Sequence, residues 1–390
     1  MLRYFVSYLL IIVYQAANAQ QLLTGEEAVG LALTNQRNLK AANLSVQQQQ
    51  QLLKGSSGLE NPQLQFQVSP YDEGAQVGVQ QTISFPSVYR SRRELQNERL
   101  RLAQLQLQGS QYDLKREVKM NYLQLQYLAE RQRILDYQDS IYKSIKIAAK
   151  RFFDAGQINK LEELQAATQA DKVNNETVRI QQDLLAEKQL FRFYTGLTDS
   201  FMVERINTYA FVPGSDSAVS NIQQQILQQQ ISINQKELGV AKTASLPELQ
   251  AGVLFPTTSG SQRPIGYQFG LTIPIWRRQN RSRIAAAKTG IEIARAEQEL
   301  SQQKINAQYR QALSNYQREL QTLGYFNNTA LPQARAIVET SQRLFQGGEL
   351  NYIESLRNLQ TAFDIFFDHI DAFRNYNETV IQLNYLNGTL

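Results

Sequence analysis

The sequence predicts a mainly helical protein with a small membrane-spanning β part, built from two structural repeats. Three observations support this fold class. A helix–turn–helix segment that begins at Arg151 recurs 192 positions later, at Arg343. Each repeat contains two segments in which apolar and polar residues alternate, as in β-strands. The helical stretches 87–153 and 277–345 are far longer than the helices of ordinary globular domains.

The duplicated turn organises the whole chain. Its first copy reads Arg-Phe-Phe-Asp-Ala-Gly-Gln-Ile-Asn from Arg151, and its second reads Arg-Leu-Phe-Gln-Gly-Gly-Glu-Leu-Asn from Arg343. The aligned glycines, Gly156 and Gly348, tolerate positive φ and allow a helix to end sharply. Another glycine follows each of them forty positions later. The repeat therefore extends well beyond the turn and divides the chain in half.

These signals set the expected boundaries. A signal peptide is expected over 1–19, because Arg3 is followed by an apolar run and by the small residues of Ala17-Asn18-Ala19. A linker over 198–217 joins the halves. The first repeat, 20–197, has strands at about 62–68 and 76–86, a long helix at about 87–153, a tip at 154–158 and a return helix to Gly196. The second repeat, 218–390, has strands at about 247–255 and 267–275, a long helix at about 277–345, a tip at 346–350 and a return helix to Gly388.

Three local features are also predicted. A first helix over 24–53 starts with a capping box of Thr24 and Glu27. Pro332 is expected to kink or interrupt the second long helix, because it lacks a backbone N–H. A short strand is expected at 209–212 within the linker.

Composition excludes several classes of function. The chain has no cysteine, which excludes disulfides, thiolate metal sites and a lipidated N-terminal cysteine. A net charge of +5 over 390 residues is too weak for a nucleic-acid-binding surface. The single histidine, His369, lies in a phenylalanine-rich helical segment, where a packed or surface side chain is expected rather than a catalytic one. No catalytic residues, metal ligands or cofactor-binding motif are evident, so we expect neither an enzyme nor a cofactor.

The predicted strands indicate a membrane barrel shared between chains. Each has an apolar face and a face of Gln, Thr, Ser and Gly, as in barrels that enclose water. Four strands cannot close a barrel, and an open edge is too costly in lipid. Two chains would form a narrow barrel of eight strands, whereas three chains would form a barrel of twelve strands that is wide enough to conduct. Trp276, Arg277 and Arg278 follow the last strand, where a membrane–water boundary is favoured.

The long helices carry many charged and glutamine residues, so they are expected to project from the membrane. Leucines at seven-residue spacing form a coiled-coil seam along the first of them, with Asn121 in the gap: Leu100, Leu107, Leu114, Leu128 and Leu135. Several such helices side by side would form a second, soluble tube.

The order of these features resembles the TolC-like outer-membrane efflux proteins over the whole mature chain. The resemblance is carried by Glu26-Glu27-Ala28, Asn61-Pro62, Leu246-Pro247, Leu331-Pro332-Gln333-Ala334 and Phe345-Gln346-Gly347-Gly348-Glu349. It implies a homotrimer with a twelve-stranded barrel and a periplasmic helical tunnel in the outer membrane of a Gram-negative bacterium. Ser84-Phe85-Pro86 and the short linker look most like the heavy-metal efflux branch of CzcC and CusC.

The resemblance also implies a constriction at the tips. The family places acidic residues after the tip glycine, and the matching positions here are Glu162 and Glu354. Where some relatives have a further acid, this chain has Gln165 and Arg357. Arg357 offers either a pair with Glu354 or an intersubunit link to Asp154 that would hold the tip shut. The alternative is a solvated surface pair with little energetic effect.

The same resemblance implies partners. A periplasmic adaptor (membrane fusion protein) would dock at the tips, at Gly156, Gln157, Gly347, Gly348 and Glu349. An inner-membrane transporter of the resistance-nodulation-division (RND) or ABC type would complete a tripartite pump. The expected function is therefore a passive exit duct. The alternatives are a type I secretion duct of the same fold and, in a different class, a secreted trimeric coiled-coil adhesin or scaffold without a pore.

Overall fold

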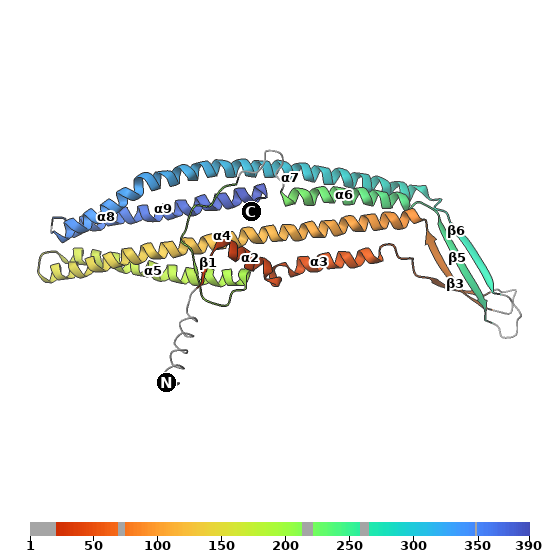
Figure 1. The fold of residues 1–390 in the computed structure, drawn as a ribbon, viewed down its shortest axis with the longest axis horizontal. Helices are drawn as coiled ribbons and strands as arrows, with labels where there is room; N and C mark the ends of the chain where they lie inside the picture. Colours follow the sequence, from red (N-terminus) through yellow and green to blue (C-terminus); the bar gives the residue numbers. More distant parts are fainter. Residues whose placement is uncertain (1–20, 69–74, 213–220, 258–264, 348) are drawn as a thin grey trace, which may run out of the picture. The chain divides into compact units, whose positions relative to one another are not determined.

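The computed structural model describes residues 21–68, 75–212, 221–257, 265–347 and 349–390 (Figure 1). The predicted signal peptide, the end of the linker and Gly348 lie outside these ranges. The helices are α2 (Gly25–Thr34), α3 (Gln36–Gly55), α4 (Pro86–Asp154), α5 (Lys160–Thr195), α6 (Ile222–Thr243), α7 (Arg277–Tyr325), the π-helix η1 (Phe326–Ala330), α8 (Leu331–Gln346) and α9 (Tyr352–Asn387). The strands are β1 (Gln21–Leu23), β2 (Gln63–Val68), β3 (Ala75–Ser84), β4 (Phe201–Val203), β5 (Glu248–Pro256) and β6 (Gly266–Thr272).

Two compact units divide the described residues, and they cut across the sequence repeats. The first, here called the strand unit, comprises residues within 39–110 and 220–306. The second, the turn unit, comprises residues within 1–38, 111–219 and 307–390. Both repeats contribute to both units, because α4 and α7 each continue from one unit into the other.

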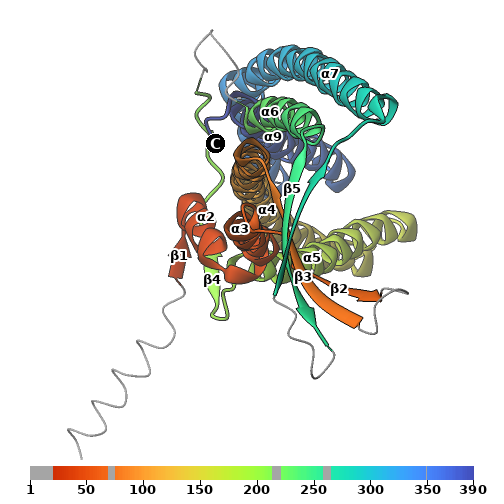
Figure 2. The same ribbon diagram turned by 90° about the vertical axis from the view of Figure 1, so that its right-hand side faces the viewer.

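The strand unit contains an antiparallel four-stranded sheet in the order β2-β3-β5-β6, in which β3 and β5 lie side by side (Figure 2). Each predicted hairpin supplies two strands. The strand predicted to end at residue 86 ends at Ser84 instead, because Pro86 begins α4. Proline suits the first turn of a helix, where its missing N–H would be unpaired anyway. β6 ends at Thr272, before Pro274.

A hydrophobic core in the turn unit is formed by side chains of α4, α5, α8 and α9. At its centre, Ala149, Leu359 and Phe363 are fully buried. Consecutive helices pair across short turns, so α8 lies beside α9 (Figure 1). This core fixes the two turns at one end of the unit, because the partly buried Ile158 and Phe345 beside them pack against it.

The predicted leucine seam is buried where it crosses the turn unit. Leu114, Leu128 and Leu135 are all buried. Asn121, which replaces leucine in the gap, donates its side-chain amide to the Glu117 carbonyl at 2.8 Å. The seven-residue spacing therefore predicts the packed face of α4, and the polar exception is satisfied by the helix itself.

The first helix is broken, which differs from the single helix predicted over 24–53. Thr24 and Glu27 form the expected capping box, but the helix ends at Asn35, whose ψ of 99° is extended. The Asn35 amide donates to the Tyr194 carbonyl at 3.2 Å, and Asn38 donates to the same carbonyl at 2.7 Å. The break thus supplies donors to the unpaired carbonyls at the C-terminus of α5.

The interruption expected at Pro332 is present as a π-helical turn. Pro332 lies in the first turn of α8, and the preceding residues form η1. The Leu331 N–H bonds to the Phe326 carbonyl, a longer step than in an α-helix. His369 on α9 lies against this turn, with Nε2 2.9 Å from the Asn327 side-chain oxygen. His369 is partly buried, and this burial lowers its pKa.

The linker forms its strand earlier than predicted. β4, at residues 201–203, pairs in parallel with β1. The predicted strand at 209–212 pairs with no strand of the described residues, because side-chain amides of α9 bind its backbone instead, as described below.

Candidate functional site: the helix turns and the sheet faces

The first turn ends α4 with a Schellman motif. Gly156 has a φ of 70°, which only glycine adopts without strain. Its N–H bonds to the Phe153 carbonyl at 2.9 Å, and the next N–H, of Gln157, bonds to the Phe152 carbonyl at 2.8 Å. Gly156 and Gln157 are both exposed at the tip.

The second turn repeats the outer of these two bonds. The Glu349 N–H bonds to the Leu344 carbonyl at 3.0 Å, and both residues lie 192 positions after their counterparts in the first turn. Gly347 keeps a helical φ of −75° at the end of α8. Gly347 and Glu349 are exposed. The sequence repeat is therefore a repeat of main-chain hydrogen bonding.

The two tip glutamates differ in what holds them. Glu162 closes a capping box at the start of α5: its carboxylate accepts from the Asn159 N–H at 2.8 Å, and its own N–H donates to the Asn159 side chain at 3.0 Å. In the second repeat, Asn351 caps α9 by accepting from the Glu354 N–H at 2.9 Å. The Glu354 carboxylate makes no hydrogen bond or ion pair to any described residue. Glu354 is thus free to meet a partner, whereas Glu162 stabilises its own helix.

The other charged tip residues are exposed. Asp154 pairs with Lys150 on the same helix at 3.2 Å. The Arg357 guanidinium has no ion pair or hydrogen bond among the described residues, and it does not reach Glu354. The Glu354–Arg357 pair is absent from the single chain. The link from Arg357 to Asp154 was predicted between subunits, and it stays a prediction.

On β3 the polar face is buried and the apolar face is exposed, whereas the polar Gln63, Gln67 and Thr272 on the outer strands are exposed. On β3, Gln80, Thr82 and Ser84 are at most 7% exposed, whereas the apolar Val79 and Ile83 on its other face are about 40% exposed. The exposed apolar side chains of the sheet are Leu64, Phe66, Val68, Val79, Ile83, Leu249, Phe255, Tyr267, Phe269 and Leu271. A sheet in water has the opposite preference, because exposed apolar area is unfavourable.

Trp276 follows β6 and is 79% exposed. Arg277 and Arg278 open α7 and are exposed as well. The three predicted boundary residues therefore present an indole ring and two cations to the surroundings, next to the exposed Ile273 and Ile275.

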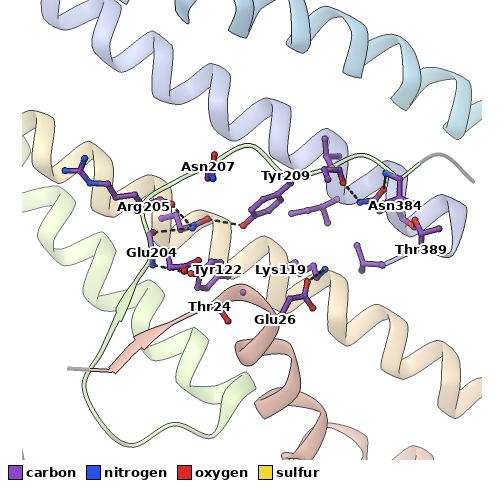
Figure 3. Close-up of a pocket in the computed structure, with 17 residues that line it drawn as sticks. Thr24, Glu26, Lys119, Tyr122, Glu204, Arg205, Asn207, Tyr209, Asn384 and Thr389 are labelled. Atoms are coloured by element: carbon purple, nitrogen blue, oxygen red, sulfur yellow. Dashed lines mark hydrogen bonds and ion pairs between the residues drawn. The ribbon is translucent and has the colours of Figure 1, made fainter. Parts of the chain in front are cut away.

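A cavity of about 480 Å³ lies in the turn unit where residues 204–212, here called the strap, cross α4 and α9 (Figure 3). Asn377 of α9 accepts from the Tyr209 N–H at 2.8 Å and donates to the Asn207 carbonyl at 2.7 Å. Asn384, two helical turns further, accepts from the Val212 N–H and donates to the Ala210 carbonyl at 3.1 Å. These two amides replace the missing strand partner of the strap.

The other wall of this cavity comes from α4. Gln126 donates to the Glu204 and Arg205 carbonyls and accepts from the Tyr209 hydroxyl at 3.0 Å. Tyr122 donates to the Leu23 carbonyl at 2.7 Å, and burial raises its pKa to about 12. An ion pair between Lys119 and Glu26, at 2.8 Å, also lines the cavity. Asparagines seven residues apart on an apolar helix are the sequence signal that would have revealed the strap contacts.

Metal ligands do not cluster anywhere in the described ranges. None of the described helices combines the length and the apolar character needed to span a membrane.

Comparison with solved structures identifies the fold. The chain is similar to the CmeC outer membrane channel of Campylobacter jejuni, at 15% identity over 94% of this chain and 85% of CmeC, with a TM-score of 0.80. It is similar to CusC at 15% identity over 93% and 91%, with a TM-score of 0.79. It is also similar to the outer membrane protein VceC of Vibrio cholerae, at 12% identity over 93% and 96%, with a TM-score of 0.76. No family model and no curated protein matches the sequence.

The chain therefore has the fold of the outer-membrane channels, mainly helical with a small sheet. The TolC-like architecture predicted from the sequence is confirmed at the level of the fold. The match to CusC is no stronger than the match to CmeC, so the heavy-metal branch stays a prediction.

Proposed function

We propose that the protein is an outer-membrane efflux duct that conducts solutes passively through a trimer. The observation that carries this proposal is the sheet, in which the polar side chains of β3 are buried while apolar side chains of all four strands are exposed. Such a sheet suits lipid on one side and water on the other. Similarity to three outer-membrane channels over more than nine-tenths of the chain supports it.

The turns are the proposed gate and docking region. Glu354 and Arg357 lie in the first two turns of α9, where both are exposed and have no side-chain hydrogen bond or ion pair to a described residue. In a trimer they are available to neighbouring subunits. The exposed tips at Gly156, Gln157, Gly347 and Glu349 would meet a periplasmic adaptor, and an RND or ABC transporter would supply the substrate. Asp154 and Glu162 are weaker candidates, because each already has a partner in its own chain.

Single-channel recording in planar lipid bilayers tests this function. The purified protein is expected to conduct and to need detergent for extraction, and Glu354→Ala with Arg357→Ala is expected to shorten its closed times. The matched control is Lys160→Ala, because Lys160 is exposed at the start of the other return helix, where it contacts Glu163 and the Phe153 ring of its own chain. Unchanged closed times in the double variant would remove the gate assignment. A protein that is soluble without detergent and does not conduct would instead be the secreted scaffold.

A further inference from the structure

The sheet ends in two unpaired edges. β2 and β6 each pair with one neighbour only, and their outer N–H and C=O groups have no strand partner among the described residues. If the sheet lies in lipid, as the proposed function requires, these edges must be paired, because no water is present to satisfy them. The strands alternate in direction, so β6 runs opposite to β2. A second copy can therefore extend the sheet as an antiparallel neighbour.

A row of side-chain hydrogen bonds crosses all four strands on the polar face. We call Gln65, Gln80, Gln250 and Thr272 the amide row. Gln65 donates to the Gln80 side-chain oxygen, and Gln80 donates to Gln250 at 2.6 Å. Gln250 in turn donates to the Thr272 hydroxyl oxygen at 3.1 Å. Each link crosses from one strand to the next.

A glycine stands opposite each glutamine of the row. The register pairs Gln65 with Gly78, Gln80 with Gly252 and Gln250 with Gly270. A Cβ at Gly270 would lie 2.9 Å from the Gln250 side-chain oxygen, and one at Gly252 would lie 3.4 Å from the Gln80 Cα. The glycines therefore leave room for each glutamine to reach the diagonal residue beyond.

The row has a direction. In every link the amide of the earlier strand donates and the oxygen of the later strand accepts. Two groups remain unused at its ends: the Thr272 hydroxyl hydrogen on β6 and the Gln65 side-chain oxygen on β2, to which no described residue donates. A donor at one edge and an acceptor at the other are what a head-to-tail continuation requires.

We propose that β6 of one chain pairs with β2 of a second copy in the register that sets Gly270 opposite the partner's Gln65. Thr272 then lies diagonal to that glutamine and donates to its free oxygen, so that the amide row continues from chain to chain and closes into a ring. A glutamine again faces a glycine across the new strand boundary, but here the glycine lies on the strand of the donor Thr272 and faces the acceptor, whereas within the chain it faces the donor.

Strand overlap favours this register over its neighbours. It pairs all of β2 with residues 267–272 of β6, whereas a shift that sets Thr272 opposite Gln65 leaves two β2 residues beyond the end of β6. A further shift of the same size leaves four of the six β2 residues unpaired with β6. Only shifts by two residues need comparison, because a shift by one would exchange the polar and apolar faces.

Barrel geometry is compatible with the same register. A line of directly opposite residues crosses the sheet from Gln63 on β2 through Gln80 and Gly252 to Gln268 on β6. In the proposed register Gln268 lies opposite the partner's Gln67. The line therefore reaches the next β2 four residues further along that strand than where it started. Over three chains this offset adds up to ~40 Å along the strands, and the closed sheet measures ~58 Å across the strands. The ratio of these two lengths corresponds to a strand tilt of about 35° from the barrel axis. Transmembrane barrels tilt by roughly 35–45°, whereas the next register gives about 47°.

The offset within the chain has the same sense. β2 lies opposite residues 75–80 of β3, whereas β6 lies opposite the part of β5 that pairs with residues 78–84 of β3. The strands thus already shift toward the helical end of the sheet from β2 to β6.

Disulfide mapping tests the register, because the sequence has no native cysteine that could form competing cross-links. Three double variants share Leu271→Cys and differ in the partner on β2: Leu64→Cys, Phe66→Cys or Val68→Cys. All four positions lie on the apolar face, so the amide row stays intact. After oxidation in the outer membrane, Leu64→Cys/Leu271→Cys is expected to give at least about fivefold more covalent oligomer than the other two, because only directly opposite cysteines meet disulfide geometry.

The controls separate the register from the function. Each single-cysteine variant should give no covalent oligomer, and a covalent dimer from Leu64→Cys alone would show that like edges pair instead. Highest yield with Phe66→Cys or Val68→Cys overturns the register. No cross-link in any variant overturns the edge pairing. Conductance of the reduced variants is recorded in parallel, so a wrong register with normal conductance leaves the proposed duct standing.

A second pair of variants tests the donated hydrogen bond. Thr272→Val keeps the shape of the side chain but removes the hydroxyl, whereas Thr272→Ser retains it. We expect the SDS-resistant oligomer of Thr272→Val to dissociate at a lower temperature than wild type, and that of Thr272→Ser to match wild type. Equal dissociation temperatures for both variants would overturn the closing link.

Discussion

Replacing Phe269 with arginine is expected to prevent stable assembly in lipid. Phe269 is 82% exposed at the centre of β6, on the apolar face of the sheet. An arginine facing the middle of a bilayer costs about 2–4 kcal/mol, and a trimer would carry this cost three times. The measurement is the fraction of protein that is recovered in outer membranes as an SDS-resistant oligomer.

The neighbouring residue provides the matched control. Gln268 lies on the opposite, polar face of the same strand, so Gln268→Arg adds the same charge toward water. It is expected to assemble as wild type does. Equal assembly of both variants would contradict the assignment of the two faces, and with it the membrane location of the sheet.

Replacing Asn377 with alanine is expected to destabilise the turn unit by about 2–4 kcal/mol. Asn377 is fully buried, and its side chain makes both hydrogen bonds that hold the middle of the strap. Its loss leaves the Tyr209 N–H and the Asn207 carbonyl without partners, at about 1–3 kcal/mol each. Urea unfolding of the detergent-solubilised protein measures the change.

Asn375→Ala is the control for this prediction. Asn375 lies on the same helix, and its side chain makes no hydrogen bond to a described residue, so the change is expected to be within about 0.5 kcal/mol. A loss at Asn377 no larger than that at Asn375 would mean that the strap is not held by its amides.

Much of the fold is predictable from the sequence because its signals are periodic or duplicated. The alternation in 63–68 and 76–84 defines two strands and their faces, and the seven-residue spacing of Leu114, Leu128 and Leu135 defines the buried side of α4. Proline and glycine mark the ends of elements. Gly196 and Gly388 both close return helices, with φ of 75° and 73°. These signals act locally, so one sequence is sufficient to interpret them.

Features that depend on distant partners are not predictable in this way. The break at Asn35 exists because α5 ends nearby with unpaired carbonyls, and nothing adjacent in sequence indicates it. Residues 209–212 of the strap were predicted to be a strand, because a segment held by Asn377 and Asn384 has the same local pattern. The difference between Glu162 and Glu354 likewise appears only in three dimensions, since both follow a capping asparagine.

The central claim is that the polar face of the sheet lines a water-filled pore. Chemical modification during single-channel recording tests it most directly, with Gln268→Cys and Phe269→Cys as adjacent probes in a chain without other cysteines. A charged, membrane-impermeant thiol reagent is expected to reduce the conductance of Gln268→Cys channels and to leave Phe269→Cys channels unchanged. A block confined to Phe269→Cys, or no response in conducting channels of either variant, would contradict the account.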